Sequence, residues 1–214
     1  WLSDWSSDVC SSDLIAEDPK DGKKYVYVFA ADSAEDAEAL NMIVAARSPL
    51  EARAAPGSFL NFYHGGYTEP SLPKNMSEDI AVLATRPGGN ADAIHPTAQG
   101  RMNRFFVARL RKSGLFLSVE SYRVFEGQSQ TGYFESALRL SEDLRTWTDR
   151  FILPNSRVAI GPVRGYDPPF GLYYPKFLAA DGSSHYAVDE SAPFYIIATK
   201  PHALIHRELS IQIL

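Results

Sequence analysis

The feature that most constrains this chain is a recurring pair of strand patterns. An aromatic strand is followed by a polar loop, and then by an apolar strand that ends in small and basic residues. The copies are residues 25–31 with 42–48, 59–63 with 80–87, 115–119 with 133–141, and 173–178 with 195–201. By subtraction, their last residues are 39, 54 and 60 positions apart. Such spacing predicts an all-β fold and favours propeller blades with insertions over a β-sandwich, which also has many short strands.

Runs of β-branched and aromatic residues between turn signals predict the individual strands. They cover residues 24–30, 59–63, 79–85, 104–110, 115–119, 132–140, 172–178, 194–199 and 205–213. Residues 33–46 fit either a short Ala-rich helix or a polar loop followed by a strand over 41–47. The second interpretation is favoured because the same layout recurs downstream.

The first fourteen residues differ from the rest of the chain. Residues 4–14 resemble the translation of a sequencing adapter, so residues 1–14 are expected to be an artefact and residues 15–214 one propeller domain. The only cysteine, Cys10, lies in this segment, and without Asp4, Asp8 and Asp13 the net charge changes from −5 to −2. An adapter at this position means that the read begins inside the gene. We therefore expect that one or more N-terminal blades are missing.

Composition and charge limit the classes of binding partner. A net charge of −5 and 22% charged residues do not indicate nucleic acid, and no apolar run approaches the roughly 20 residues of a membrane span. The five histidines show no metal-ligand spacing, so neither a metal nor a cofactor is expected. The compartment stays open, and a secreted or periplasmic location is compatible with the sequence.

One short motif points to a family. Residues 141–147, Ser-Glu-Asp-Leu-Arg-Thr-Trp, resemble the S-x-D-L-x-x-W turn that closes a blade in five-bladed propeller glycoside hydrolases, the arabinanase, β-xylosidase, invertase and levansucrase type. Asp18-Pro19 with residues 21–25, His95-Pro96 before residues 104–107, and residues 173–178 before 181–182 resemble other blade segments of these families. The resemblance covers most of residues 18–214. It implies a partial five-bladed β-propeller that acts on glycosidic bonds of oligo- or polysaccharides.

The resemblance also implies catalysis by carboxyl groups around a central funnel. Glu69 is the favoured general acid, Asp18 the supporting carboxylate, and Glu135 a further candidate, while Glu120 and Asp167 are weaker. Each has a structural alternative: Asp18 can cap a turn, Glu69 can be a surface turn residue, and Glu135 can be a paired strand residue. The catalytic base of these families lies on the first blade, so the fragment is expected to be inactive as given.

Sugar contacts are expected from two histidines and three tyrosines, although core packing is the alternative for the tyrosines. These residues are His64, Tyr67, His95, Tyr173 and Tyr174. Two other functions remain open. One is a non-catalytic carbohydrate-binding propeller, and the other is a glycoside phosphorylase with a phosphate pocket formed by Arg101, Arg104 and Arg109.

Overall fold

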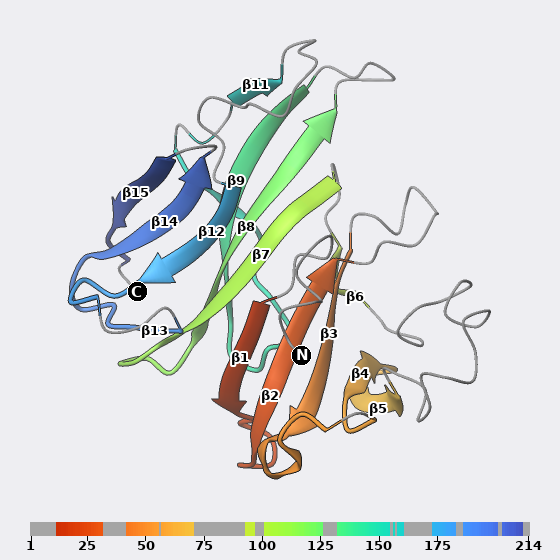
Figure 1. Ribbon diagram of the computed structural model, residues 1–214. Helices are drawn as coiled ribbons and strands as arrows, with labels where there is room; N and C mark the ends of the chain where they lie inside the picture. The colour runs from red at the N-terminus through yellow and green to blue at the C-terminus, as the bar shows by residue number, and fades with distance from the viewer. Residues whose placement is uncertain are drawn as a thin grey trace. The chain divides into compact units, whose positions relative to one another are not determined.

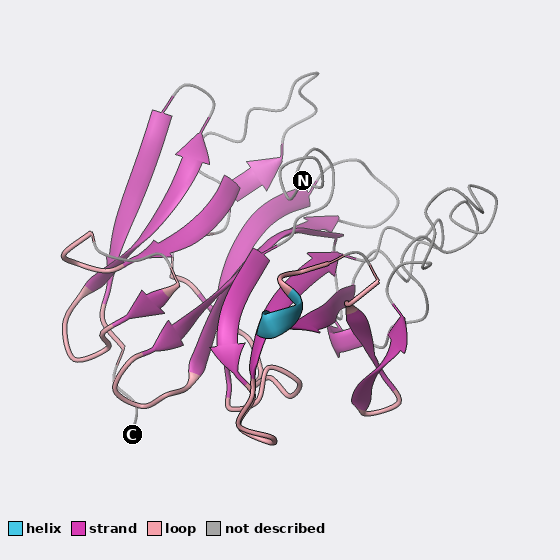
Figure 2. Ribbon diagram, turned by 60° about the horizontal axis from the view of Figure 1, so that its bottom comes forward, coloured by secondary structure: helices cyan, strands magenta, loops and turns pink. Residues whose placement is uncertain are grey.

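The computed structural model is all-β, with antiparallel sheets and one short 3-10 turn in the part of the chain that it describes (Figures 1 and 2). It describes residues 12–31, 42–55, 57–70, 93–96, 101–125, 132–154, 156, 158–160, 173–182, 186–200 and 203–211. The chain divides into two compact units, residues 1–96 and 97–214. The all-β prediction is confirmed.

The first unit is an antiparallel sheet built from consecutive strands in the order β1-β2-β3-β4-β5, with β6 paired to β3. Its elements are β1 (Ser12–Glu17), β2 (Lys24–Ala31), β3 (Met42–Pro49), the 3-10 turn η3 (Leu50–Ala52), β4 (Leu60–Tyr63), β5 (Gly66–Pro70) and β6 (Ala93–Pro96). Strand β1 begins inside the adapter-like segment, and its Leu14 is buried.

Alternation along β2 decides which face of this sheet is buried. Tyr25, Tyr27 and Phe29 are at most 8% exposed, whereas Val26 and Val28 between them are half-buried. Successive side chains of a strand point to opposite faces, so the three aromatic rings form the inner face. The ring centroids of Tyr27 and Phe29 lie 6.4 Å apart in a stacked arrangement. The aromatic run therefore forms the predicted strand because every second ring is removed from water.

The segment around Glu69, expected to be a loop, forms a β-hairpin instead. Strands β4 and β5 are joined by His64 and Gly65, whose φ angles are 51° and 79°. A two-residue turn with positive φ at both positions matches the right-handed twist of the two strands, and glycine adopts this conformation without steric cost. The prediction missed β5 because the aromatic and glycine-containing segment was interpreted as one loop rather than as a turn followed by a strand.

The described residues of the second unit form two sheets. In the first of them the strands follow the order β10-β9-β8-β7-β13, with β11 also paired to β9, and in the other the order is β12-β14-β15. The strands are β7 (Arg101–Leu110), β8 (Phe116–Phe125), β9 (Gly132–Ser141), β10 (Phe151–Ile152), β11 (Val158–Ile160), β12 (Tyr173–Leu178), β13 (Ala187–Val188), β14 (Phe194–Lys200) and β15 (Ala203–Leu209). Pairing of β13 with β7 is parallel, and the other described pairings are antiparallel.

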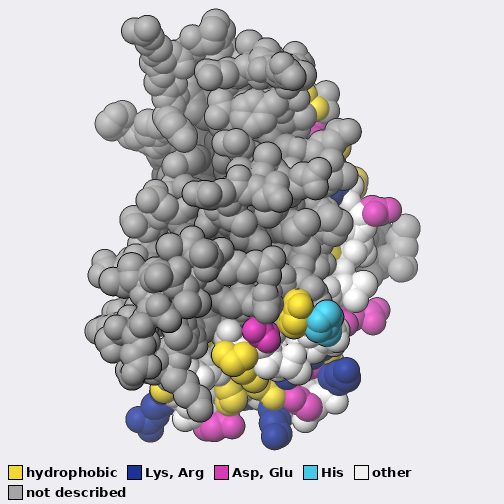
Figure 3. Space-filling model, turned by 90° about the vertical axis from the view of Figure 1, so that its right-hand side faces the viewer, with side chains coloured by type: hydrophobic (Ala, Val, Ile, Leu, Met, Phe, Trp, Pro, Cys, Tyr) yellow, Lys and Arg dark blue, Asp and Glu magenta, His cyan; other side chains and the backbone are white. Residues whose placement is uncertain are grey.

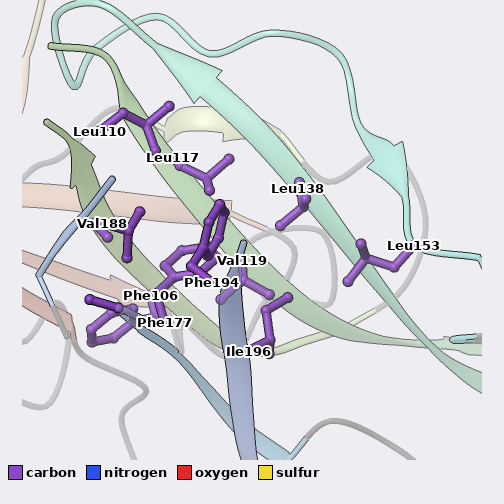
Figure 4. Close-up of a cluster of buried hydrophobic side chains, with 12 residues drawn as sticks. Phe106, Leu110, Leu117, Val119, Leu138, Leu153, Phe177, Val188, Phe194 and Ile196 are labelled. Atoms are coloured by element: carbon purple, nitrogen blue, oxygen red, sulfur yellow. The ribbon is translucent and has the colours of Figure 1, made fainter. Parts of the chain in front are cut away.

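One hydrophobic core joins the two sheets of this unit (Figure 4). The sheet of β7, β8 and β9 contributes Phe106, Leu117, Val119 and Leu138 among others, all at most 6% exposed. Strands β12 and β14 contribute rings and branched side chains from the other side, including Phe177, Phe194 and Ile196. The centroids of Phe177 and Phe194 are 5.9 Å apart. Face-to-face packing of this kind occurs both between neighbouring propeller blades and in sandwiches, so it does not separate the two architectures.

Several predicted boundaries change. Strand β3 (Met42–Pro49) confirms the strand interpretation, so a helix continuing to residue 46 is wrong. The last strand ends at Leu209 rather than at residue 213, which leaves Ser210 and Ile211 outside it. The strand expected over 79–85 lies outside the described residues. The radial arrangement of blades stays a prediction.

Candidate functional site

The turn after β9 is built by the side chains of its motif. The hydroxyl of Ser141 accepts hydrogen bonds from the backbone N–H groups of Asp143 and Leu144, at 3.3 and 2.9 Å. Oδ1 of Asp143 accepts from the backbone N–H groups of Arg145 and Thr146, both at 2.8 Å. Asp143 thus bonds its own turn backbone, as short polar side chains do in turns.

Two apolar residues of the same turn point inward. Leu144 has a φ of 61° and is fully buried, so its burial holds a backbone conformation that L-residues rarely adopt. The ring of Trp147 meets that of Phe105 on β7 edge to face, with centroids 5.6 Å apart. The motif therefore forms the turn at the end of β9, and its tryptophan packs against β7.

In the sheet of β7, β8 and β9, the face turned away from the hydrophobic core is buried, and it carries polar residues beside apolar ones such as Phe105 and Phe116. Register places Glu120 of β8 opposite Ala137 of β9, with Arg139 and Glu135 on either side of Ala137. Residues two apart on a strand share a face, so Glu120, Arg139 and Glu135 lie on one face. Their exposed fractions are 0%, 8% and 4%. We call these three residues the polar cluster.

Glu120 and Arg139 form a buried ion pair. Nε of Arg139 donates to Oε1 of Glu120 at 3.2 Å, and Nη1 of Arg139 donates to the carbonyl oxygen of Thr148 at 2.9 Å. Burial raises the pKa of Glu120 above its ordinary value, and the positive charges of Arg139 and Arg150 oppose this rise only in part. The Glu120 carboxyl therefore holds its proton to a higher pH than an exposed glutamate does.

Glu135 is the second carboxylate of the cluster. It lies opposite Tyr122, diagonally across the β8–β9 pair from Glu120. Diagonal neighbours on one face are about 7–8 Å apart, with somewhat shorter separations between Cβ atoms. This general spacing is comparable with the roughly 5–9.5 Å between the two carboxyl groups of glycosidases. The arrangement thus places two carboxyl groups on one buried face of the sheet.

Comparison of the chain with protein-family models, with curated protein sequences and with solved structures gave no match.

Asp18 takes part in a turn and an ion pair in the first unit. Its Oδ1 accepts from the backbone N–H of Lys20 at 2.9 Å, and its carbonyl oxygen accepts from the N–H of Gly22 at 2.8 Å. The carboxylate is fully buried and pairs with the guanidinium of Arg47, which lies over the rings of Tyr25 and Tyr67 at 3.8 and 4.4 Å. Arg47 therefore brings Asp18 and Tyr67 together, although Asp18 comes from the β1–β2 turn.

Glu69 is separated from Tyr67 by the register of the β4–β5 hairpin. Glu69 pairs with Asn61, whereas Tyr67 pairs with Phe62 across a bulge. Neighbouring residues of β4 point to opposite faces, so Glu69 and Tyr67 lie on opposite faces of the hairpin. Tyr67 is 7% exposed and its centroid is 5.8 Å from that of Tyr27, which makes it a packing residue.

The remaining predicted sugar contacts stay predictions. His64 is exposed at the turn, with its ring centroid 3.9 Å from that of Tyr63. His95 lies on β6, and Tyr173 and Tyr174 lie on β12, but their side chains are outside the described part. The same holds for the side chains of Arg101 and Arg104, while Arg109 is exposed.

Neither a metal centre nor a membrane helix emerges from the described residues. Within them, no three His, Cys, Asp or Glu side chains are grouped so as to hold a metal ion. No helix in these segments has the length and apolar character needed to span a membrane. On the described part of the surface in Figure 3, acidic, basic and apolar side chains are interspersed.

Sequence reasoning missed the two arginines that organise these clusters. Arg47 and Arg139 each pair with a buried carboxylate, and neither was singled out. The sequence did contain a signal for the second pair. In β8, Ser118 and Glu120 stand on either side of the apolar Val119, and in β9, Arg139 stands between Leu138 and Leu140. The expected strand ended at residue 119, which hid the position of Glu120 inside β8.

Proposed function

We propose that this chain is part of a β-propeller protein that acts on glycosidic bonds of carbohydrates. Two features support the architecture: the long strands of each sheet are consecutive in sequence, and side chains of the motif over residues 141–147 form the turn after β9. Sheets of consecutive antiparallel strands are the building units of propellers.

The observation that carries the proposed activity is the presence of Glu120 and Glu135 on one face of the β8–β9 pair. Glycoside hydrolysis needs one carboxyl group that donates a proton to the leaving oxygen, and one carboxylate that attacks the sugar or activates water. The raised pKa of Glu120 suits the acid, as burial does for other glycosidase acids. Glu135 takes the second role.

Arg139 has a supporting part in this proposal. Its charge faces Glu120 at 3.2 Å and limits how far burial raises the pKa of that carboxyl. When Glu120 gives up its proton, Arg139 stabilises the resulting carboxylate, and the proton is regained from the water that completes hydrolysis. In this proposal the sugar approaches from the side of Glu135, which at 4% exposed is the less deeply buried of the two carboxyl groups.

The burial of Glu120 also favours a second candidate, a non-catalytic carbohydrate-binding propeller. In that case the Glu120–Arg139 pair serves only to hold the sheet together, because a carboxyl without exposed surface does not meet a ligand. Aromatic rings would then bind the sugar, and the protein would not catalyse hydrolysis.

Substitution of the two glutamates separates the candidates. Aryl-glycoside hydrolysis and oligosaccharide binding are measured in the full-length protein for the wild type, Glu135→Gln and Glu120→Gln, with exposed Glu142→Gln as the matched control. Catalysis by the polar cluster predicts a loss of turnover of at least about 100-fold in both variants, with binding retained. Binding without turnover in the wild type establishes the second candidate. Turnover that depends on added phosphate indicates a phosphorylase.

The same assay tests the acid that the sequence favoured. If hydrolysis collapses in Glu69→Gln and persists in Glu120→Gln and Glu135→Gln, the acid lies on the β4–β5 hairpin and the polar cluster is structural. Asp18→Asn is a poor test of catalysis, since it also removes an ion pair and a turn contact.

A further inference from the structure

A short segment of the second unit, residues 186–191, runs along the edge of β7, and we call it the strap. The backbone N–H of Arg109 donates to the carbonyl oxygen of Tyr186 at 2.7 Å, and that of Arg111 donates to the carbonyl oxygen of Val188 at 2.9 Å. Between these contacts, β13 pairs in parallel with β7. The strap therefore satisfies N–H groups on an edge that would otherwise present them for pairing.

One end of the strap is held by apolar contacts. Val188 is fully buried in the core cluster beside Phe106 and Phe177 (Figure 4). The ring of Tyr186 lies 5.6 Å from that of Phe106, with 40% of the tyrosine exposed. Removal of the strap from β7 would thus expose Val188, which ties this end of the strap to the core.

The other end is held by a carboxylate. The backbone N–H groups of Lys112 and Ser113, consecutive in the β7–β8 turn, donate to different oxygens of Glu190, the first at 3.1 Å. Successive N–H groups of a turn form a concavity that binds anions. Arg111 and Lys112 are exposed charges of this turn, and Asp189 of the strap is held by its own contacts to Ser191.

We propose that Glu190 is a latch, whose carboxylate fills an anion-binding site in the β7–β8 turn and so keeps the strap on the edge of β7. The geometry requires a carboxylate in particular, since both oxygens accept from backbone donors. Burial raises the pKa of Glu190, but the hydrogen bonds from its own backbone, Ser113 and Lys112 outweigh it and lower the pKa, so the latch is charged at neutral pH. Opening of the latch uncovers the β7 edge.

Amide hydrogen exchange tests the latch directly. The amides of Arg109 and Arg111 report strap opening, because each is bonded to a strap carbonyl. In Glu190→Gln we expect their exchange to be about tenfold faster, since hydrogen bonds to a charged acceptor are lost. The matched control Glu142→Gln, an exposed acid of the same unit, leaves both rates unchanged. The amide of Val119 in β8 keeps its protection in both variants.

Equal protection of Arg109 and Arg111 in the wild type and in Glu190→Gln would overturn the latch. A second measurement uses Glu190→Ala, in which the anion site is vacated. Sodium acetate is expected to slow the exchange of these amides again, whereas sodium chloride at the same ionic strength is not. If acetate has no more effect than chloride, the turn does not bind a carboxylate and the proposal fails.

Discussion

Replacement of Arg139 by Met removes the charge partner of a fully buried carboxylate. Arg139 donates to Glu120 at 3.2 Å and to the carbonyl oxygen of Thr148 at 2.9 Å, and its side chain is 8% exposed. Loss of one partner of a buried ion pair costs about 3–5 kcal/mol of unfolding free energy. In a chain of this size each kcal/mol lowers Tm by roughly 2–4 °C, so we expect a decrease of about 6–20 °C.

Urea unfolding followed by circular dichroism measures this loss, with Arg111→Met as the control because Arg111 is exposed. The double variant Glu120→Leu with Arg139→Met is expected to regain most of the stability. In that variant no buried charge is left without a partner, and apolar residues of similar volume fill the space.

The pH dependence of the same variant gives an independent check. Burial raises the pKa of Glu120 in the folded state, so the stabilisation from its protonated form is complete below the pKa of the unfolded chain and is lost as pH rises through the folded value. Arg139 lowers this pKa. Without Arg139, the pH range in which the protonated form of Glu120 stabilises the fold therefore extends to higher pH. The destabilisation by Arg139→Met is therefore smaller at pH 5 than at pH 8. A loss below about 1 kcal/mol, or equal losses at both pH values, would refute the reasoning.

Three further substitutions test the packing and the turns. Phe177→Ala empties part of the core cluster and is expected to lower the free energy of unfolding by about 3–5 kcal/mol, measured by thermal unfolding. Phe177→Leu is expected to lower it by less than about 1.5 kcal/mol. Gly65→Ala should cost about 1–2 kcal/mol, all of it from positive φ, because no atom lies within 4 Å of the added Cβ; a larger loss would mean a steric clash. Asp143→Ala removes the acceptor for two backbone N–H groups and should cost about 1 kcal/mol in urea unfolding, while exposed Glu142→Ala stays neutral.

The long strands could be predicted because their sequence pattern agrees with their environment. In β2 the residues Tyr25, Tyr27 and Phe29 alternate with valines, and every second side chain is buried. The turn from Ser141 was predictable for a related reason, since Ser141 and Asp143 bond backbone groups two or three residues away. Contacts of such short range depend little on the rest of the fold.

The candidate site was much less predictable. Glu135 was identified, and Glu120 as a weaker candidate, but their arrangement with Arg139 depends on the register between β8 and β9. Register decides which charges meet on one face, and a shift of one residue would move each side chain to the other face. Likewise Asp18 was identified, yet its ion-pair partner Arg47 lies 29 residues away in the chain.

By itself, the sequence determined that the chain is all-β, where most long strands run, and how the turn after β9 is closed. Tertiary structure alone decided on β13, which is two residues long, and on the burial of Glu120. A two-residue strand has no pattern of its own, and it forms because the β7 edge, the core around Val188 and the Glu190 contact hold it. Whether a charge is buried likewise depends on the segments that pack over it, and these are often distant in sequence.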